Sequence, residues 1–144
     1  MKKNAFDKKH KLLLIIGRAG SGKSKYLNNY SLEKGIPILN FDSILGKEIP
    51  EGKDQNYVYD FIRNFLSTYK PEEILLDKKH ILYQKDSNID LLDFLKELSK
   101  QKTVIATWNG YIENNKLIHI CDALNGITKE YDLDTLDCGY LEIL

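Results

Sequence analysis

A lysine and a serine at the end of a glycine-rich stretch are the residues of this chain best suited to chemistry on phosphate. Residues 17–24 fit the pattern G-x-x-x-x-G-K-[S/T] at every fixed position. In such a loop, glycines let backbone N–H groups turn toward one anion, the lysine reaches the β- and γ-phosphates, and the final hydroxyl can ligate Mg²⁺. We expect nucleotide contacts from Gly17, Arg18, Ala19, Gly20, Ser21, Gly22, Lys23, Ser24 and Lys25. The alternative is a glycine-rich turn with no ligand.

An aspartate further along the chain could complete a magnesium site. Asp77 follows the apolar residues 74–76, about 55 residues after the glycine-rich stretch. Proteins that bind Mg²⁺ with a nucleotide need a carboxylate at the end of a neighbouring strand to hold the water shell of the ion. We expect Ser24 to ligate Mg²⁺ directly and Asp77 to hold it through water. The alternative is an aspartate that only ends a strand or caps a turn.

The elements around these residues alternate between strand and helix. The continuous apolar run at 12–16 predicts a strand buried on both faces of a parallel sheet. Apolar spacing, glycines and prolines predict helices over 23–33, 54–69 and 89–98, and Asn88 or Asp90 could cap the last of them. Further strands are predicted over 36–39, 74–77 and 103–107. Three breakers in 43–53 predict a loop there.

The pattern changes after Asn109 and Gly110. Short antiparallel or edge strands are expected at 117–120, 129–133 and 140–143, and nothing there predicts a helical lid domain. Residues 12–144 are therefore expected to form one nucleotide-binding domain after a flexible basic tail at 1–11. The alternation predicts an α/β fold, a three-layer sandwich with a mainly parallel sheet, in which ligands bind beyond the carboxyl ends of the strands. We expect a P-loop NTPase fold of the additional-strand type, like that of AAA and RecA proteins.

A sensor residue is expected on the strand at 103–107. In additional-strand ATPases, this later strand lies between the strands that carry the loop and the aspartate, so its end faces the γ-phosphate. Thr107 or Asn109 occupies that place here. The alternative for Thr107 is an ordinary residue of a strand. Trp108 and Tyr111, which flank Asn109 and Gly110, could stack on an adenine or pack under the C-terminal strands; packing is the preferred interpretation.

The residues for hydrolysis are less complete than those for binding. Additional-strand ATPases commonly have a glutamate base directly after the motif aspartate, and this chain has Lys78 there. An ordinary lysine is protonated at neutral pH and cannot accept a proton. Asp42 or His80 could replace the glutamate; otherwise Asp42 caps the turn at 43–46 and His80 is a surface or packing residue.

Cations that could stabilise a transferring phosphoryl group are also scarce. The chain has two arginines, Arg18 in the glycine-rich stretch and Arg63 in an expected helix. Lys100, Lys102 or a partner protein could supply the charge instead. The sequence therefore supports nucleotide binding better than fast autonomous hydrolysis.

The composition excludes several other classes of protein. The formal net charge is zero, which gives no reason to expect direct binding to nucleic acid or to a membrane surface. No apolar run approaches the ~20 residues needed to span a bilayer, and the lysine-rich start does not resemble a signal peptide. Cys121 and Cys138 lack metal-site spacing, so reduced thiols in the cytoplasm are expected.

Together, the glycine-rich stretch, ILLDKKHILY, LLDFLKELSKQKTVIATWNG and KLIHICDALNGITKEYDL resemble the BrxF family, small P-loop proteins of type III BREX phage-defence systems. The similarity spans about residues 10–144 and is most specific from Leu98 to Gly110. Members often have an acidic residue where this chain has His80, and arginine near Lys100 and Lys102. The resemblance implies an intracellular bacterial component that works beside other BREX proteins, including methyltransferase and ATPase subunits.

Three functions are compatible with these residues. The first is an AAA-like module of a phage-defence complex that binds ATP and Mg²⁺ and hydrolyses ATP slowly or with the help of a partner. The second is a nucleotide-gated regulatory subunit without turnover, which best explains Lys78. The third is a small-molecule kinase, which fits poorly because kinases use several arginines to clamp phosphates. The sequence also leaves three questions open: whether the nucleotide is ATP or another one, whether the chain forms a homo-oligomer, and whether it contacts DNA indirectly.

Overall fold

The computed structural model describes residues 11–48, 55–79, 82 and 89–143 of the 144-residue chain. The expected flexible tail lies outside these residues except for Lys11, as do His80 and Asn88. Among the described residues, no helix is both long enough and apolar enough to cross a membrane.

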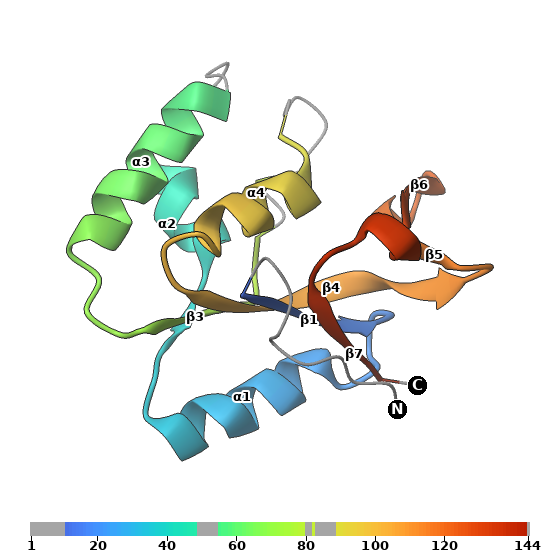
Figure 1. Ribbon diagram of the computed structural model, residues 1–144, viewed down its shortest axis with the longest axis horizontal. Coiled ribbons are helices and arrows are strands. Elements are labelled where there is room, and N and C mark those ends of the chain that lie inside the picture. Colours follow the sequence, from blue (N-terminus) through green and yellow to red (C-terminus); the bar gives the residue numbers. More distant parts are fainter. Residues whose placement is uncertain (1–10, 49–54, 80–81, 83–88, 144) are drawn as a thin grey trace.

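Strands and helices alternate through the first two thirds of the chain, and strands follow in the last third (Figure 1). The elements are β1 (Leu12–Gly17), α1 (Lys23–Lys34), β2 (Ile38–Leu39), α2 (Phe41–Glu48), α3 (Gln55–Ser67), β3 (Glu73–Leu76), α4 (Leu91–Leu98), β4 (Thr103–Glu113), β5 (Lys116–Asp122), β6 (Ile127–Asp132), the 3-10 turn η2 (Leu133–Thr135) and β7 (Gly139–Glu142). The protein is therefore of the α/β class.

The central sheet is parallel, in the order β2-β3-β4-β1-β7. The strand that begins at Thr103 lies between the strand before the glycine-rich stretch and the strand before Asp77, as expected from the sequence. Its register places Thr107 opposite Ile15 and Asn109 opposite Gly17. Both polar residues therefore lie beside the point where β1 ends and the glycine-rich stretch begins.

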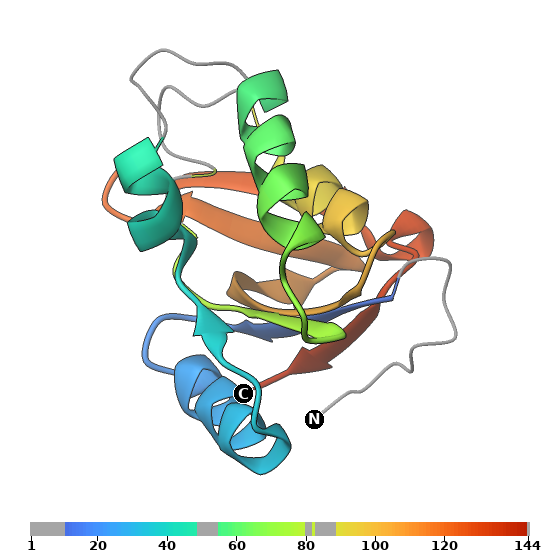
Figure 2. The ribbon, with the colours of Figure 1, turned by 90° about the vertical axis from the view of Figure 1, so that its left-hand side faces the viewer.

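Apolar cores lie on both faces of this sheet, because successive residues of a strand point to opposite faces. On β1, Leu12, Leu14 and Ile16 belong to the larger core, which α3 and α4 cover, while Leu13 and Ile15 belong to the smaller one under α1. Figures 1 and 2 show α1 on one side of the sheet and the other helices on the opposite side. The expected three layers are confirmed.

Local signals define the ends of two helices. α1 ends at Gly35, whose φ of 69° is the left-handed conformation common after a helix and whose N–H donates to the carbonyl of Ser31. α4 begins after Asp90, whose carboxylate accepts a 3.0 Å hydrogen bond from the N–H of Asp93. Of the two caps expected for this helix, the structure therefore shows Asp90.

The prediction of a loop over 43–53 is wrong for residues 43–48, because α2 extends to Glu48. Residues 49–54 lie outside the described part of the chain. The helix begins after Asn40, whose side-chain oxygen accepts a 3.0 Å bond from the N–H of Ser43. The aromatic ring of Phe41 is fully buried against Phe94, with ring centroids 6.2 Å apart. A cap and one buried aromatic residue thus outweigh Gly46, the breaker that lies within α2.

The strand expected over 103–107 is longer than expected and does not end before Asn109 and Gly110. β4 continues to Glu113 and pairs antiparallel with β5, which pairs with β6, while β7 returns to pair parallel with β1. Gly110 is required here, since a Cβ would lie 1.8 Å from the carbonyl oxygen of Ile118. The C-terminal segment is β-rich as predicted, and one continuous strand joins it to the central sheet.

Candidate functional site

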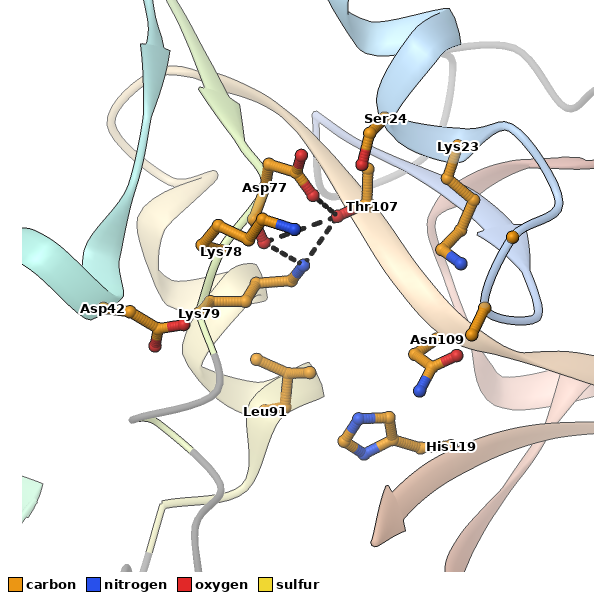
Figure 3. Close-up of a pocket in the computed structure, with 12 residues that line it drawn as sticks. Lys23, Ser24, Asp42, Asp77, Lys78, Lys79, Leu91, Thr107, Asn109 and His119 are labelled. Carbon is orange, nitrogen blue, oxygen red and sulfur yellow. Dashed lines mark hydrogen bonds between the residues drawn. The ribbon is translucent and has the colours of Figure 1, made fainter. Parts of the chain in front are cut away.

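A pocket of about 300 Å³ lies where the glycine-rich stretch, the end of β3 and the middle of β4 meet (Figure 3). Three lysines and two aspartates line it, so charged groups of both signs face the same space. Its lining residues are Ala19, Gly20, Lys23, Ser24, Asp42, Asp77, Lys78, Lys79, Leu91, Thr107, Asn109 and His119. The pocket lies on the carboxyl side of β1 and β3, where ligands of parallel α/β proteins bind.

The glycines of the stretch at 17–24, called the glycine-rich loop below, have two structural roles. Gly20 and Gly22 have φ values of 81° and 104°, which other residues rarely adopt. At Gly17, a Cβ would lie 2.2 Å from Ser21 Oγ, so the Ser21 side chain would have to turn away. Substitution at Gly20 or Gly22 would strain the backbone of the loop.

The open start of α1 faces this loop. Gly22 precedes the helix and offers no side-chain acceptor to the N–H groups of the first turn. These groups carry the positive end of the helix dipole and commonly bind anions. Lys23 Nζ donates a 2.8 Å bond to the carbonyl of Arg18, so the side chain folds over its own loop. Burial lowers the pKa of Lys23, and the nearby Asp77 carboxylate opposes that effect.

Ser24 and Asp77 both line the pocket, which brings the two expected magnesium ligands to one site. Within the described residues, no group of three or more histidine, cysteine, aspartate or glutamate side chains could hold a metal ion. A hydroxyl and one carboxylate fit Mg²⁺, because this ion keeps several waters and is usually held by one or two protein oxygens together with phosphate oxygens. The donor set therefore fits Mg²⁺ that arrives with a phosphate ligand.

Three side chains form a hydrogen-bonded chain across β3 and β4. Lys79 Nζ donates to Thr107 Oγ1 at 2.9 Å, and Thr107 Oγ1 donates to Asp77 Oδ1 at 2.9 Å. Lys79 Nζ also donates to the carbonyl oxygen of Asp77 at 2.9 Å. Figure 3 shows these bonds at the centre of the site. Thr107 thus bonds to the expected metal ligand and to a lysine.

Lys79 is the main residue of the pocket that the sequence reading missed. Its side chain is 6% exposed, whereas its neighbour Lys78 is exposed. Burial lowers the pKa of Lys79 to about 7, although the Asp77 carboxylate acts in the opposite direction. The sequence held one signal for Lys79, which is the pair of lysines just beyond the buried strand β3. Adjacent residues of an extended segment point to opposite sides, so one lysine of such a pair can point inward.

Asp42 lies at the pocket, in the first turn of α2. Asn40 accepts the N–H of Ser43 at the start of this helix, and the interpretation that Asp42 caps the turn at 43–46 stays a prediction. The backbone N–H groups of Phe41 and Asp42 donate to the carbonyl of Lys78 at 2.7 and 3.2 Å, which ties the start of α2 to the segment after β3. Asp42 is thus the second carboxylate of the pocket.

Asn109 and His119 line the side of the pocket opposite Asp42 (Figure 3). Asn109 Oδ1 is buried and has no hydrogen-bond partner among the described residues, while its amide nitrogen lies 3.5 Å from the carbonyl of Ile120. The sequence reading did not select His119, which the turn between β4 and β5 brings back beside Gly110. Its ring packs 4.8 Å from that of Trp108, and its Nδ1 lies 3.3 Å from Cys121 Sγ.

The two aromatic residues near Asn109 differ in their surroundings. Trp108 is fully buried, and its Nε1 donates a 3.1 Å bond to the carbonyl of Ile118. Its ring centroid lies 5.7 Å from that of Tyr131. This confirms the packing interpretation for Trp108. Tyr111 instead lies under the guanidinium of Arg18, whose central carbon is 4.0 Å from the ring centroid.

The other basic candidates lie outside the pocket. Arg63 pairs with Asp60 on the exposed side of α3 at 2.5 Å. Lys102 Nζ donates to two backbone carbonyls at 2.7 and 2.6 Å just before β4 begins, and Lys100 pairs with Glu97 at 3.0 Å. Lys100 and Lys102 therefore lie toward the amino end of β4, away from Thr107. Any charge that they supply to a bound nucleotide would have to come from another copy of the chain.

Five of the expected nucleotide contacts do not line the pocket: Gly17, Arg18, Ser21, Gly22 and the exposed Lys25. The loop's Ala19, Gly20, Lys23 and Ser24 reach the pocket, together with Asp77 and Thr107. Comparison of the chain with protein-family models, curated proteins and solved structures found no match. The resemblance to the BrxF family therefore stays a prediction, and the geometry of this pocket is the basis for the function proposed below.

Proposed function

We propose that the chain binds a nucleoside triphosphate together with Mg²⁺, as a P-loop protein of the additional-strand type. One observation carries this proposal: the glycine-rich loop, Asp77 and Thr107, which come from three neighbouring parallel strands, meet at one pocket. A loop without a ligand would not require a carboxylate and a hydroxyl from two other strands to face it. ATP is the proposed nucleotide, since the sequence has no Asn-Lys-x-Asp guanine signature.

Each part of the pocket would have a separate role in binding. The loop and the start of α1 would surround phosphate oxygens with N–H donors, and Lys23 would leave the Arg18 carbonyl for the β- and γ-phosphates. Ser24 would ligate Mg²⁺, and Asp77, fixed by Thr107, would hold its water shell. When bound, Mg²⁺ neutralises phosphate charge.

Turnover requires a group that takes a proton from the attacking water. Asp42 is the proposed base, because it lies at the pocket and Asp77 is engaged with Thr107. The water oxygen would bond to the γ-phosphorus as the bond to the β–γ bridging oxygen breaks, and the water proton would pass to Asp42. The proposed activity is slow or partner-dependent ATP hydrolysis, because the chain's two arginines lie outside the pocket.

A nucleotide-gated subunit without turnover is the second candidate. The observation in its favour is that Lys78, not a carboxylate, follows Asp77 and lines the pocket. The BrxF resemblance supports a place for either activity in a phage-defence complex in the cytoplasm, with other BREX proteins or a second copy of the chain as partners. A small-molecule kinase has the least support.

A thermal-shift experiment tests the proposal. A ligand that binds only the folded state at 100 times its Kd stabilises that state by about 2.7 kcal/mol, so ATP with Mg²⁺ is expected to raise the Tm of the wild-type protein. Lys23→Ala should abolish this increase, and Lys34→Ala, in the last turn of the same helix, should not. An equal increase in the Lys23→Ala protein would overturn the proposal. Phosphate release by the wild-type protein would separate the enzyme from the regulatory subunit.

A further inference from the structure

The ammonium group of Lys79 has an unusual place at the pocket. It is buried at the junction of β3 and β4, yet Lys79 is one of the residues that line the pocket. Its two hydrogen bonds go to a backbone carbonyl and to the hydroxyl of Thr107. A lysine ammonium carries three donors, so one donor remains for a ligand in the pocket.

These hydrogen bonds do not neutralise the charge of Lys79. Among the residues that the structure describes, no carboxylate oxygen lies within 4.0 Å of Lys79 Nζ, and Asp77 Oδ1 is linked to it through Thr107. A buried cation without an ion-pair partner is costly for a folded protein. An anion in the pocket would compensate this charge, which gives a reason for a lysine at this position.

The position of Lys79 relative to the glycine-rich loop indicates which anion it would meet. Ala19, Gly20 and Lys23 line the pocket from the loop, while Lys79 lines it from the side of Thr107, on the neighbouring strands (Figure 3). A nucleotide whose inner phosphates lie in the loop would extend its terminal phosphate away from the loop. Lys79 and Thr107 belong to the segments on that side.

The arginines of the chain lie elsewhere. Arg18 is stacked on Tyr111, and Arg63 is paired with Asp60 on α3. Neither lines the pocket, and the sequence contains no third arginine. Within one copy of the chain, the role of a cation at the terminal phosphate therefore falls to a lysine. Of the candidates after β3, Lys79 is buried and held in place, whereas Lys78 is exposed.

We propose that Lys79 binds the terminal phosphate of the nucleotide and thereby makes the site select triphosphates over diphosphates. The inference rests on the proposed function, because it places a nucleotide in the glycine-rich loop. It assigns to Lys79 a specificity role that is separate from the role of Lys23. Lys23 would contribute to the binding of both nucleotides, and Lys79 only to the binding of the one with a third phosphate.

Equilibrium binding of a non-hydrolysable ATP analogue and of ADP, each with Mg²⁺, tests this assignment. The wild-type protein should prefer the triphosphate, and Lys79→Met should reduce that preference by about tenfold or more, because a hydrogen bond to a charged group is worth at least as much as the ~1.4 kcal/mol of a tenfold change. ADP affinity should stay nearly constant. Lys102→Met is the matched control, because Lys102 also donates to two acceptors but lies outside the pocket.

Each other outcome is also informative. An unchanged preference in Lys79→Met, an equal loss of both affinities, or the same effect in Lys102→Met would overturn the inference and leave the proposed function standing. If the wild-type protein binds neither nucleotide, the proposed function fails, and the inference fails with it. If Lys79→Met does not fold, Lys79→Gln, which keeps a hydrogen-bond donor without the charge, carries the same test.

Discussion

Thr107 Oγ1 donates a 2.9 Å hydrogen bond to Asp77 Oδ1, so a hydroxyl on β4 fixes the carboxylate at the end of β3. The two residues are 30 positions apart in the sequence, and the parallel pairing of β3 with β4 brings them together. The same hydroxyl accepts a bond from Lys79. Its single proton is therefore directed to the carboxylate, and the orientation of Asp77 depends on Thr107.

Thr107→Val should weaken Mg²⁺-dependent nucleotide binding. Valine has nearly the same shape but cannot donate to Asp77, and loss of a partner that orients a metal ligand typically reduces metal affinity roughly 10- to 100-fold. Titration of Mg²⁺ at constant ATP would measure this effect. Thr107→Ser, which keeps the hydroxyl, should restore most of the affinity. If valine and serine behave alike, the hydroxyl does not position Asp77.

Lys79→Met should stabilise the protein in the absence of nucleotide. The pKa of Lys79 falls from an ordinary 10.5 to about 7 on folding, because burial disfavours its charge despite Asp77 and Asp42, while Lys23 and Lys78 add repulsion. Replacement of a buried charge by an apolar side chain is often stabilising by about 1–4 kcal/mol. The two lost bonds, to the Asp77 carbonyl and to Thr107 Oγ1, offset part of this gain, at about 1 kcal/mol each. Urea unfolding at pH 6 would measure the difference, and a large destabilisation would contradict it.

The stability difference between Lys79→Met and the wild-type protein should depend on pH with a definite sign. Below pH 7, Lys79 is protonated in both the folded and the unfolded state, and the full cost of burial is present. Between pH 7 and the unfolded value of 10.5, the unfolded state binds more protons, so wild-type stability rises with pH. The advantage of Lys79→Met should therefore shrink from pH 7 to pH 10. An advantage that grows with pH would show that the lysine is not buried as a cation.

Asp90 should stabilise the contact between α4 and β6. It caps α4, accepts a 2.7 Å bond from the hydroxyl of Tyr131 and pairs with Lys129. Burial alone would raise the pKa of Asp90, but hydrogen bonds from Lys129, from the backbone of Asp93 and from Tyr131 lower it. The stability that ionised Asp90 contributes is therefore present above its ordinary pKa and is lost as the pH falls through its pKa in the folded protein.

Asp90→Ala should lower the free energy of unfolding by about 1–2 kcal/mol at pH 7, the usual cost of losing a helix cap. The loss should decrease in acid, because the wild-type carboxylate is then protonated. Denaturant unfolding at pH 7 and pH 3 would measure both values. Asp93→Ala is a suitable control, since the Asp93 backbone N–H remains to donate to Asp90. An equal loss at both pH values would contradict an ionic contribution.

Gly110→Ala should disrupt the pairing of β4 with β5. Its Cβ would lie 1.8 Å from the carbonyl oxygen of Ile118, which a backbone atom can relieve only by moving the strand. We expect a loss of about 1–3 kcal/mol, typical of overpacking, and a displaced His119. Gly126→Ala, at a turn where nothing lies within 4 Å of the added Cβ, should cost less despite its φ of 66°. Similar Tm values for the two variants would contradict this account of Gly110.

Local patterns predicted the elements that carry the loop and Asp77. An apolar run before glycines, and three apolar residues before an aspartate, depend only on neighbouring residues, and β1, α1 and β3 appear where they were expected. The position of β4 between β1 and β3 was also predicted, from the strand arrangement of additional-strand ATPases. The P-loop assignment, the nucleotide and the phage-defence role stay predictions.

The residues that were missed depend on contacts between distant segments. Lys79 turns inward because Thr107, 28 positions away, accepts its bond. His119 reaches the pocket because β4 continues through Gly110 and pairs with β5, where the sequence suggested a break. α2 forms where breakers predicted a loop, because Phe41 packs on Phe94. Such partners cannot be recognised from the spacing of residues in one segment.

The central claim is that the glycine-rich loop binds nucleotide phosphates through Lys23. Calorimetric titration of Mg–ATP into the isolated protein tests it most directly, with Lys23→Ala beside the wild type. The account predicts saturable binding of one nucleotide per chain in the wild-type protein and a loss of at least ~1.4 kcal/mol, or tenfold in Kd, in the variant. Equal binding by both proteins, or no binding by the wild type, would contradict it.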